Sequence, residues 1–96
     1  MADNEYYIRA FIDGNQKVIK EAYVIMKKQF VRFVAFKFPE LSSLYYEDVY
    51  HESFILLQEN ILKGVISTNL LTTTLLAYTE GIGFRVASRL MRRNKV

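Results

Sequence analysis

Apolar residues recur at intervals of three and four over three long segments of the chain, 16–38, 43–63 and 71–94, and over a short one, 5–12. On a helix of 3.6 residues per turn this spacing gathers them on one side. No segment shows the sustained alternation of apolar and polar residues that marks a half-buried strand. The sequence therefore predicts the all-α class: a small helical bundle of a short N-terminal helix and three longer helices, forming one domain over residues 1–96.

Residues that favour turns and helix ends separate these segments. Asp13-Gly14-Asn15 supplies turn chemistry after the first segment. Pro39 is the only proline and cannot continue the second helix, while Gly64 suits the end of the third. Side chains that can cap a helix start stand before the first and third helices, namely Asp3 or Asn4 and Ser42 or Ser43.

The apolar side of each long helix is expected to face a common core, because a chain of 96 residues has room for only one. The inward residues of the second helix are then Val18, Ile19, Ala22, Ile25, Met26, Phe30, Phe33 and Val34. Those of the third helix are Tyr46, Val49, Tyr50, Ser53, Phe54, Leu57 and Ile61. Those of the fourth are Leu71, Leu75, Tyr78, Ile82, Val86 and Leu90.

The opposite side of the third helix mixes acids with apolar residues. Ile55 and Leu62 fall among the polar side chains of this face, where a purely solvated surface needs neither. Isolated apolar residues are normal on protein surfaces, which is one interpretation. The other is a docking face for a basic partner, acidic at its edges and apolar at its centre. The polar residues of this face are Asp48, His51, Glu52, Gln58 and Glu59.

Charge is divided into blocks, although the net charge is only +3. Residues 17–37 carry six cations against the single acid Glu21, whereas residues 38–62 carry no Lys or Arg. After Glu80 there are no acids. Blocks of alternating sign suggest two kinds of partner, a polyanion such as nucleic acid and a basic protein surface. The alternative is that the charges simply lie on solvated helix faces.

The composition and the N-terminal residues indicate where in the cell the protein is found. The sequence has no cysteine, which excludes a disulfide framework and thiolate metal sites. The N-terminal residues are acidic where a secretory signal would be basic and then apolar, and no apolar run is long enough to cross a membrane. We therefore expect a cytoplasmic protein that does not enter a membrane.

Side chains arranged for catalysis are not recognisable. His51 is the only histidine; it stands three residues from Asp48 and one from Glu52, but a metal site there would lack further His or Cys ligands. Gly81-Ile82-Gly83 lies inside a predicted helix and lacks the strand and the other glycines of a phosphate loop, so it is better suited to close packing. No serine has a base placed beside it by a known motif. The sequence predicts a protein that is not an enzyme and holds no metal or cofactor.

Nucleic-acid binding has more support. The fourth helix ends in a run of arginines, and the loop before it carries Ser67, Thr68 and Asn69. Together with the basic second helix, these are the residue types that contact phosphates and base edges. None of these features alone specifies a family.

The segment Glu47-Asp48-Val49-Tyr50-His51-Glu52-Ser53-Phe54 resembles the acidic signature in region two of bacterial RNA polymerase sigma factors, especially the extracytoplasmic-function group. The order of elements over about residues 7–95 is similar to that region as well. Tyr78, Gly81-Ile82-Gly83 and the terminal run from Leu90 to Arg93 occupy the places of recognisable family segments.

This resemblance implies a transcription initiation function. Region two docks its acidic helix on the clamp helices of the beta-prime subunit of core RNA polymerase, and its loop and last helix bind and melt the minus-ten promoter element. Such a domain can also bind an anti-sigma factor. The polymerase-binding residues would be Asp48, His51, Glu52, Ile55 and Glu59. The DNA-binding residues would be Lys63, Ser67, Thr68, Asn69, Thr72, Thr73, Arg85, Arg89, Arg92 and Arg93.

Several positions depart from the family pattern, and these leave the preferred promoter sequence open. Complete family members continue into a second helical domain that reads the minus-thirty-five element, so the resemblance implies one domain of such a factor or a shortened member. The rival interpretation is a helical protein–protein interaction module without DNA binding. The departures are His51 for a usual Gln, Gln58 for an aromatic residue, Arg85 for Asn and Ser88 for Asp.

Overall fold

The computed structural model describes residues 3–66 and 74–93. The described residues form four α-helices and a 3-10 turn and contain no strand. The prediction of a small all-α bundle with one short and three longer helices is therefore confirmed. The helices are α1 (Asp3–Asp13), α2 (Gln16–Lys37), α3 (Tyr46–Leu62) and α4 (Leu75–Arg93), with a 3-10 turn, η1 (Ser43–Tyr45), before α3.

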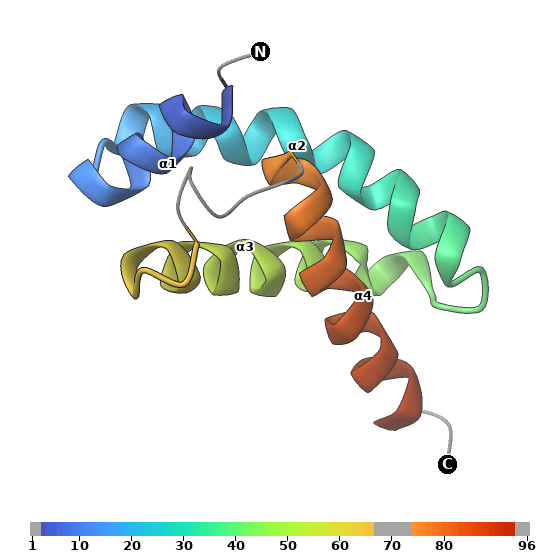
Figure 1. Cartoon of the computed structure of the whole chain (residues 1–96). Coiled ribbons are helices and arrows are strands. Elements are labelled where there is room, and N and C mark those ends of the chain that lie inside the picture. Colours follow the sequence, from blue (N-terminus) through green and yellow to red (C-terminus); the bar gives the residue numbers. More distant parts are fainter. Residues whose placement is uncertain (1–2, 67–73, 94–96) are drawn as a thin grey trace.

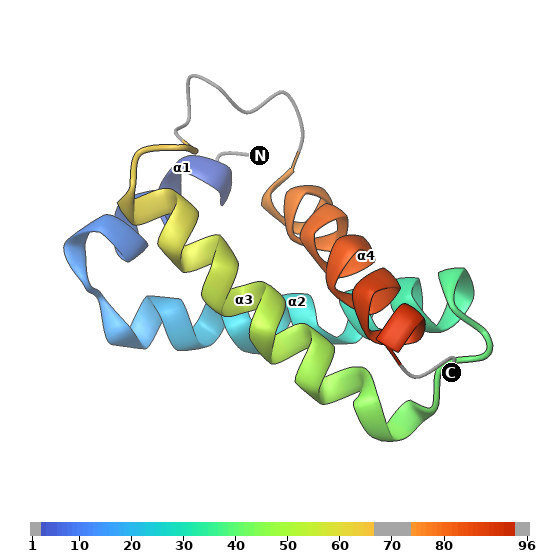
Figure 2. The same cartoon turned by 90° about the horizontal axis from the view of Figure 1, so that it is seen from below.

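The helices enclose a single apolar core. In Figure 1, α2 and α3 form two sides of the bundle, α1 lies against one end of α2, and α4 runs from beside α2 across α3. Figure 2 shows α3 and α4 alongside one another over α2. This arrangement leaves one side of α2 and one side of α3 turned away from the core.

Aromatic side chains from α1, α2 and α3 form the centre of the core. The rings of Phe30 and Tyr50 are both fully buried, with centroids 4.8 Å apart. Phe11 and Tyr23 pack against Phe54 at 5.6 and 5.0 Å. The Tyr50 hydroxyl donates a hydrogen bond to the Tyr23 carbonyl oxygen, and burial raises the pKa of Tyr50. A buried phenol with a backbone acceptor fixes the rotation of α3 against α2.

The predicted inward face of the third helix is confirmed. Its residues are buried, apart from Tyr46, which is half-buried at the start of α3. The predicted turn at Asp13-Gly14-Asn15 agrees, and Asn15 caps α2 by accepting a hydrogen bond from the Val18 amide at 3.3 Å. The prediction that Ser42 or Ser43 caps the third helix is wrong. Ser42 accepts a hydrogen bond from the Leu44 amide at 3.2 Å and so caps η1, whereas α3 follows Tyr45 without a side-chain cap. Gly64 has φ +77° after the end of α3, a conformation that favours glycine.

The predicted boundaries of all four helices need adjustment. The first helix is longer than predicted, Asp3–Asp13 rather than 5–12, the third ends at Leu62 rather than residue 63, and Thr74 precedes α4 instead of belonging to it. The second helix ends at Lys37 rather than residue 38. The Phe38 amide still donates a hydrogen bond to the Val34 carbonyl, but the backbone angles of Phe38 are no longer helical. The third helix is not continuous from residue 43, since η1 precedes α3. Residues 71–73 and 94 of the predicted fourth helix, Leu71 among them, lie outside the described residues.

The prediction that Asn4 caps the first helix is wrong. Asn4 lies inside α1, and its side-chain oxygen accepts a hydrogen bond from the Leu75 amide at 2.8 Å. Thr74 accepts another from the Ala77 amide at 3.0 Å. The two side chains thus satisfy two amides at the start of α4 that have no partner within the helix. Asn4 therefore links α1 to the start of α4, a role that local sequence rules do not consider.

The inward assignment of Ile25 is also wrong, since this side chain is 56 % exposed. The buried residues of α2 from Val18 to Val34 follow an interval of four, and Ile25 falls to one side of that line. Neighbouring helices cover this line and also Ile19, Tyr23 and Phe33 beside it, but they leave Ile25 exposed.

The close approach predicted for the glycines of the fourth helix holds at Gly83 alone. Gly83 is buried, and a Cβ built there would lie closer than 3.0 Å to two ring carbons of Phe30. Gly81 is exposed, and a Cβ there would meet nothing within 4 Å. Gly83 therefore marks the point where α4 crosses closest to Phe30 of α2.

Candidate interaction surface on α3 and α4

The outer face of α3 presents every residue predicted to bind polymerase. All five are exposed, and Ile55 at 40 % and Leu62 at 63 % supply the apolar part of the face. The helix turns these residues outward because its opposite side is bound into the core. We call this set the acidic strip; it comprises Asp48, His51, Glu52, Ile55, Glu59 and Leu62.

Glu47 belongs to the packing of α3 rather than to the acidic strip. Its carboxylate lies 2.7 Å from the Lys27 ammonium of α2. This hydrogen bond lowers the pKa of Glu47 and raises the pKa of Lys27. Asp48 and Glu59, in contrast, have no ion pair with another described residue. Their charges are therefore available to a partner.

His51 lies at the edge of the acidic strip, next to the ring of Tyr23. The two ring centroids are 6.4 Å apart in an edge-on arrangement. Within residues 3–66 and 74–93, no group of three or more His, Cys, Asp or Glu side chains is placed to hold a metal ion. His51 can donate or accept hydrogen bonds at a protein surface from this position.

The predicted DNA-binding cations of the fourth helix are exposed on α4. We call Arg85, Arg89, Arg92 and Arg93 the basic edge. Lys63 is also exposed, directly after α3. The remaining predicted DNA-binding residues lie outside the described residues; they are Ser67, Thr68, Asn69, Thr72 and Thr73.

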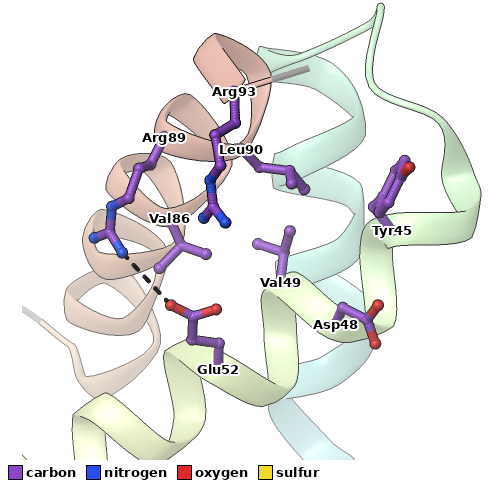
Figure 3. Close-up of a pocket in the computed structure, with 8 residues that line it drawn as sticks. All are labelled: Tyr45, Asp48, Val49, Glu52, Val86, Arg89, Leu90 and Arg93. Atoms are coloured by element: carbon purple, nitrogen blue, oxygen red, sulfur yellow. Dashed lines mark ion pairs between the residues drawn. The ribbon is translucent and has the colours of Figure 1, made fainter.

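The acidic strip and the basic edge meet in a cleft between α3 and α4 (Figure 3). The cleft has a volume of about 230 Å³. Glu52 and Arg89 approach across it, with 3.7 Å between Oε2 and Nη1. Arg93 extends from α4 toward the same space. The remaining lining residues are Tyr45, Asp48, Val49, Val86 and Leu90.

The Glu52–Arg89 ion pair separates Arg89 from the other arginines of the basic edge. Arg85 and Arg92 have no ion pair with another described residue, whereas Arg89 is shared with Glu52. Both partners of that pair are 53 % exposed, so it contributes only about 0 to 1 kcal/mol. A stronger ligand can therefore displace either member. Sequence reasoning missed the contact because it joins two helices, and no pattern within one helix reports it.

The structure also reveals exposed residues on α2 that the sequence pattern did not single out. Val24 is 64 % exposed, next to the misassigned Ile25. Lys20, Lys28 and Arg32 are exposed on the same helix. The charges of the second segment were visible in the sequence, but their combination with apolar residues on one face was not.

Comparison of the chain with protein-family models, curated proteins and solved structures gives no significant match. The resemblance to sigma region two therefore depends on the residues and motifs quoted above. Among the described residues, no helix combines the length and the apolar content needed to cross a membrane.

Proposed function

We propose that this chain is the promoter-binding domain of a transcription initiation factor, of the sigma region two type. The acidic strip of α3 docks on core RNA polymerase at the clamp helices of its beta-prime subunit. The C-terminal part of the fold then binds the minus-ten promoter element and holds it open. The domain contributes binding and no catalysis.

One arrangement carries the proposal: a strip of acids with an apolar centre lies beside an edge of arginines on the adjacent helix. Ile55 and Leu62 give a basic protein partner an apolar contact, while Asp48 and Glu59 give it charge complementarity. A nucleic acid would be repelled by this strip, so its ligand is a protein.

The basic edge supplies the complementary contact with DNA. Arg85 and Arg92 are seven residues apart on α4, which places them about two turns from one another on one side of the helix. Guanidinium groups bind phosphates through paired hydrogen bonds, and this contact fixes the position of a protein on the nucleic-acid backbone. Arg89 joins them when Glu52 releases it.

A protein–protein interaction module is the second candidate, and the Glu52–Arg89 pair favours it. This pair neutralises one cation of the basic edge and draws it toward α3. The acidic strip would serve such a module equally well. The two candidates differ in their prediction for phosphate binding, which the module does not need.

The test separates the two faces by charge reversal and avoids the shared pair. Asp48→Lys with Glu59→Lys should weaken binding to purified core polymerase by at least about tenfold, because like charges then face the clamp. Promoter binding through the basic edge should survive wherever a polymerase complex still forms. Binding is measured by fluorescence anisotropy of the labelled domain, and circular dichroism confirms that each variant is folded.

Arg85→Glu with Arg92→Glu should have the opposite effect. Polymerase docking should persist, while the polymerase complex binds promoter DNA more weakly. The plot of log affinity against log salt should become shallower by about 2, since two phosphate contacts are lost. Retention of the domain on heparin should fall in parallel.

Charge-matched controls come from exposed residues outside both faces. Asp13→Lys with Glu40→Lys makes the same charge change as the acidic-strip variant and should leave polymerase binding unchanged. If the arginine variant keeps both its heparin retention and its salt slope, the DNA-binding function is wrong. If polymerase binding is equally insensitive to the acidic-strip variant, the whole proposal fails.

A further inference from the structure

The outer side of α2 carries three exposed cations and one exposed acid, Glu21, around an apolar centre. Lys20, Lys28 and Arg32 are exposed, and none of them has an ion pair with another described residue. Val24, between Lys20 and Lys28, is 64 % exposed, with Ile25 beside it at 56 %. We call Lys20, Val24, Lys28 and Arg32 the basic strip. Apolar side chains surrounded by charge are typical of interaction surfaces.

The acidic strip of α3 presents the opposite charges in a matching order. Along α3 the sequence is acid, acid, apolar residue and acid; along α2, taken against the chain direction, it is cation, cation, apolar residue and cation. At 1.5 Å of rise per residue, the four positions agree along the two helices to within about 1.5 Å. The resulting pairs are Asp48 with Arg32, Glu52 with Lys28, Ile55 with Val24, and Glu59 with Lys20.

We propose that a second copy of this chain docks its acidic strip on the basic strip, with α3 of one copy antiparallel to α2 of the other. Each charged position then faces an opposite charge, and Ile55 covers Val24. Glu52 exchanges its exposed contact with Arg89 for Lys28 of the other copy. A direct experiment can decide this inference, which does not depend on the proposed transcription function.

The association is head-to-tail. The two strips lie on different helices, and their residues are exposed, so every docked copy still offers one free strip. A head-to-tail contact adds copies one after another, as a ring or as an open chain, so association should grow with concentration. Because one helix face on another makes a small interface, the complex belongs to the transient class below about 1,200 Å².

The first test is sedimentation equilibrium of the wild-type chain over a concentration series. The weight-average mass should rise above the monomer value of 11.3 kDa as the concentration increases from about 50 µM to about 1 mM. Raising the salt from about 0.05 M to about 0.5 M should return the mass toward the monomer, because it screens exposed charges.

Charge reversal on each strip makes the test specific. Asp48→Lys with Glu59→Lys should abolish the mass increase, and so should Lys20→Glu with Lys28→Glu. An equimolar mixture of these two variants should associate again, because the unchanged basic strip of the first variant meets the unchanged acidic strip of the second. The charge-matched control variant Asp13→Lys with Glu40→Lys keeps both strips and should associate as the wild type does.

Ile55→Ser distinguishes docking from general attraction between oppositely charged proteins. Placed in the Lys20→Glu, Lys28→Glu variant, it leaves the net charge unchanged, so general attraction in the mixture would persist. Docking should instead weaken by about tenfold, since the buried contact with Val24 is lost.

Three results would overturn the inference. The wild-type chain could remain a monomer throughout the series, its association could be indifferent to both reversals, or the mixture could fail to associate. Loss of heparin retention in the Lys20→Glu, Lys28→Glu variant, with no change in mass, would assign the basic strip to a polyanion instead. These experiments contain neither polymerase nor promoter DNA, so their failure leaves the proposed function standing.

Discussion

Gly83 offers the most direct test of how α4 is seated on the bundle. We expect Gly83→Ala to destabilise the fold and Gly81→Ala to stabilise it, although both glycines lie in the same helix two residues apart. Each substitution gains up to about 1 kcal/mol of helix propensity. At Gly81 nothing opposes that gain, because a new methyl group meets no atom within 4 Å.

At Gly83 the gain is outweighed by a clash. The methyl group would lie closer than 3.0 Å to two ring carbons of Phe30, whereas carbon atoms pack at about 3.5 to 4.0 Å. Phe30 is fully buried and its ring centroid is 4.8 Å from that of Tyr50, so the ring cannot move outward. Overpacking of this kind costs about 1 to 3 kcal/mol. With about 1 kcal/mol of propensity deducted, Gly83→Ala should lose up to about 2 kcal/mol.

Urea unfolding followed by circular dichroism measures both variants, with the free energy of unfolding taken at constant m value. A double-mutant cycle identifies the clash: Phe30→Leu should cost at least about 1 kcal/mol less in the Gly83→Ala background than in the wild type. If Gly83→Ala stabilises the protein as Gly81→Ala does, α4 does not cross α2 at Phe30, and the cleft between α3 and α4 is wrongly placed.

Two further predictions concern α3. Leu57→Ala should lower the free energy of unfolding by about 2 to 5 kcal/mol, because Leu57 is fully buried, whereas Ile55→Ala on the outer face should change it by about 0.5 kcal/mol or less; equal losses in urea unfolding would mean that the two faces are exchanged. Lys27→Met should raise the pKa of Glu47 toward its ordinary value in an NMR titration, and a pKa that does not move would show that the pair does not form in solution. Since the Lys27 hydrogen bond lowers the Glu47 pKa, its contribution to stability is present above the unfolded pKa of Glu47 and is lost as the pH falls through the folded value.

The inner side of α3 could be predicted from the sequence because its determinants are local. From Val49 to Ile61 the apolar residues follow the period of a helix, and a face that must be buried needs no knowledge of its neighbour. The exposure of the acidic strip follows from the same period, since it is the remaining side. The role of Gly83 could be predicted in part, because a glycine inside a helix suggests close packing. Only the crossing of α4 over Phe30 distinguishes Gly83 from Gly81.

Contacts between distant segments could not be predicted in this way. Asn4 looked like a cap for its own helix, yet its partner is Leu75, 71 residues away. A capping side chain bonds to whichever amide packing brings within reach, and no local rule contains that information. Ile25 was assigned to the core for a related reason. The width of the buried stripe on α2 depends on how much of it α1 and α4 cover.

The Glu52–Arg89 pair connects the two faces that the proposed function uses, and its strength limits what that connection can do. A basic partner that takes Glu52 releases Arg89 for phosphate, so protein docking and DNA binding would favour one another, each by the same factor. An exposed pair at 3.7 Å is worth at most about 1 kcal/mol, which corresponds to about a fivefold change in affinity. Under the proposed function, stronger coupling between polymerase and promoter binding would have to arise elsewhere in the assembly. Arg85 and Arg92, which have no such pair within the described part of the chain, would then supply the part of DNA binding that does not depend on docking.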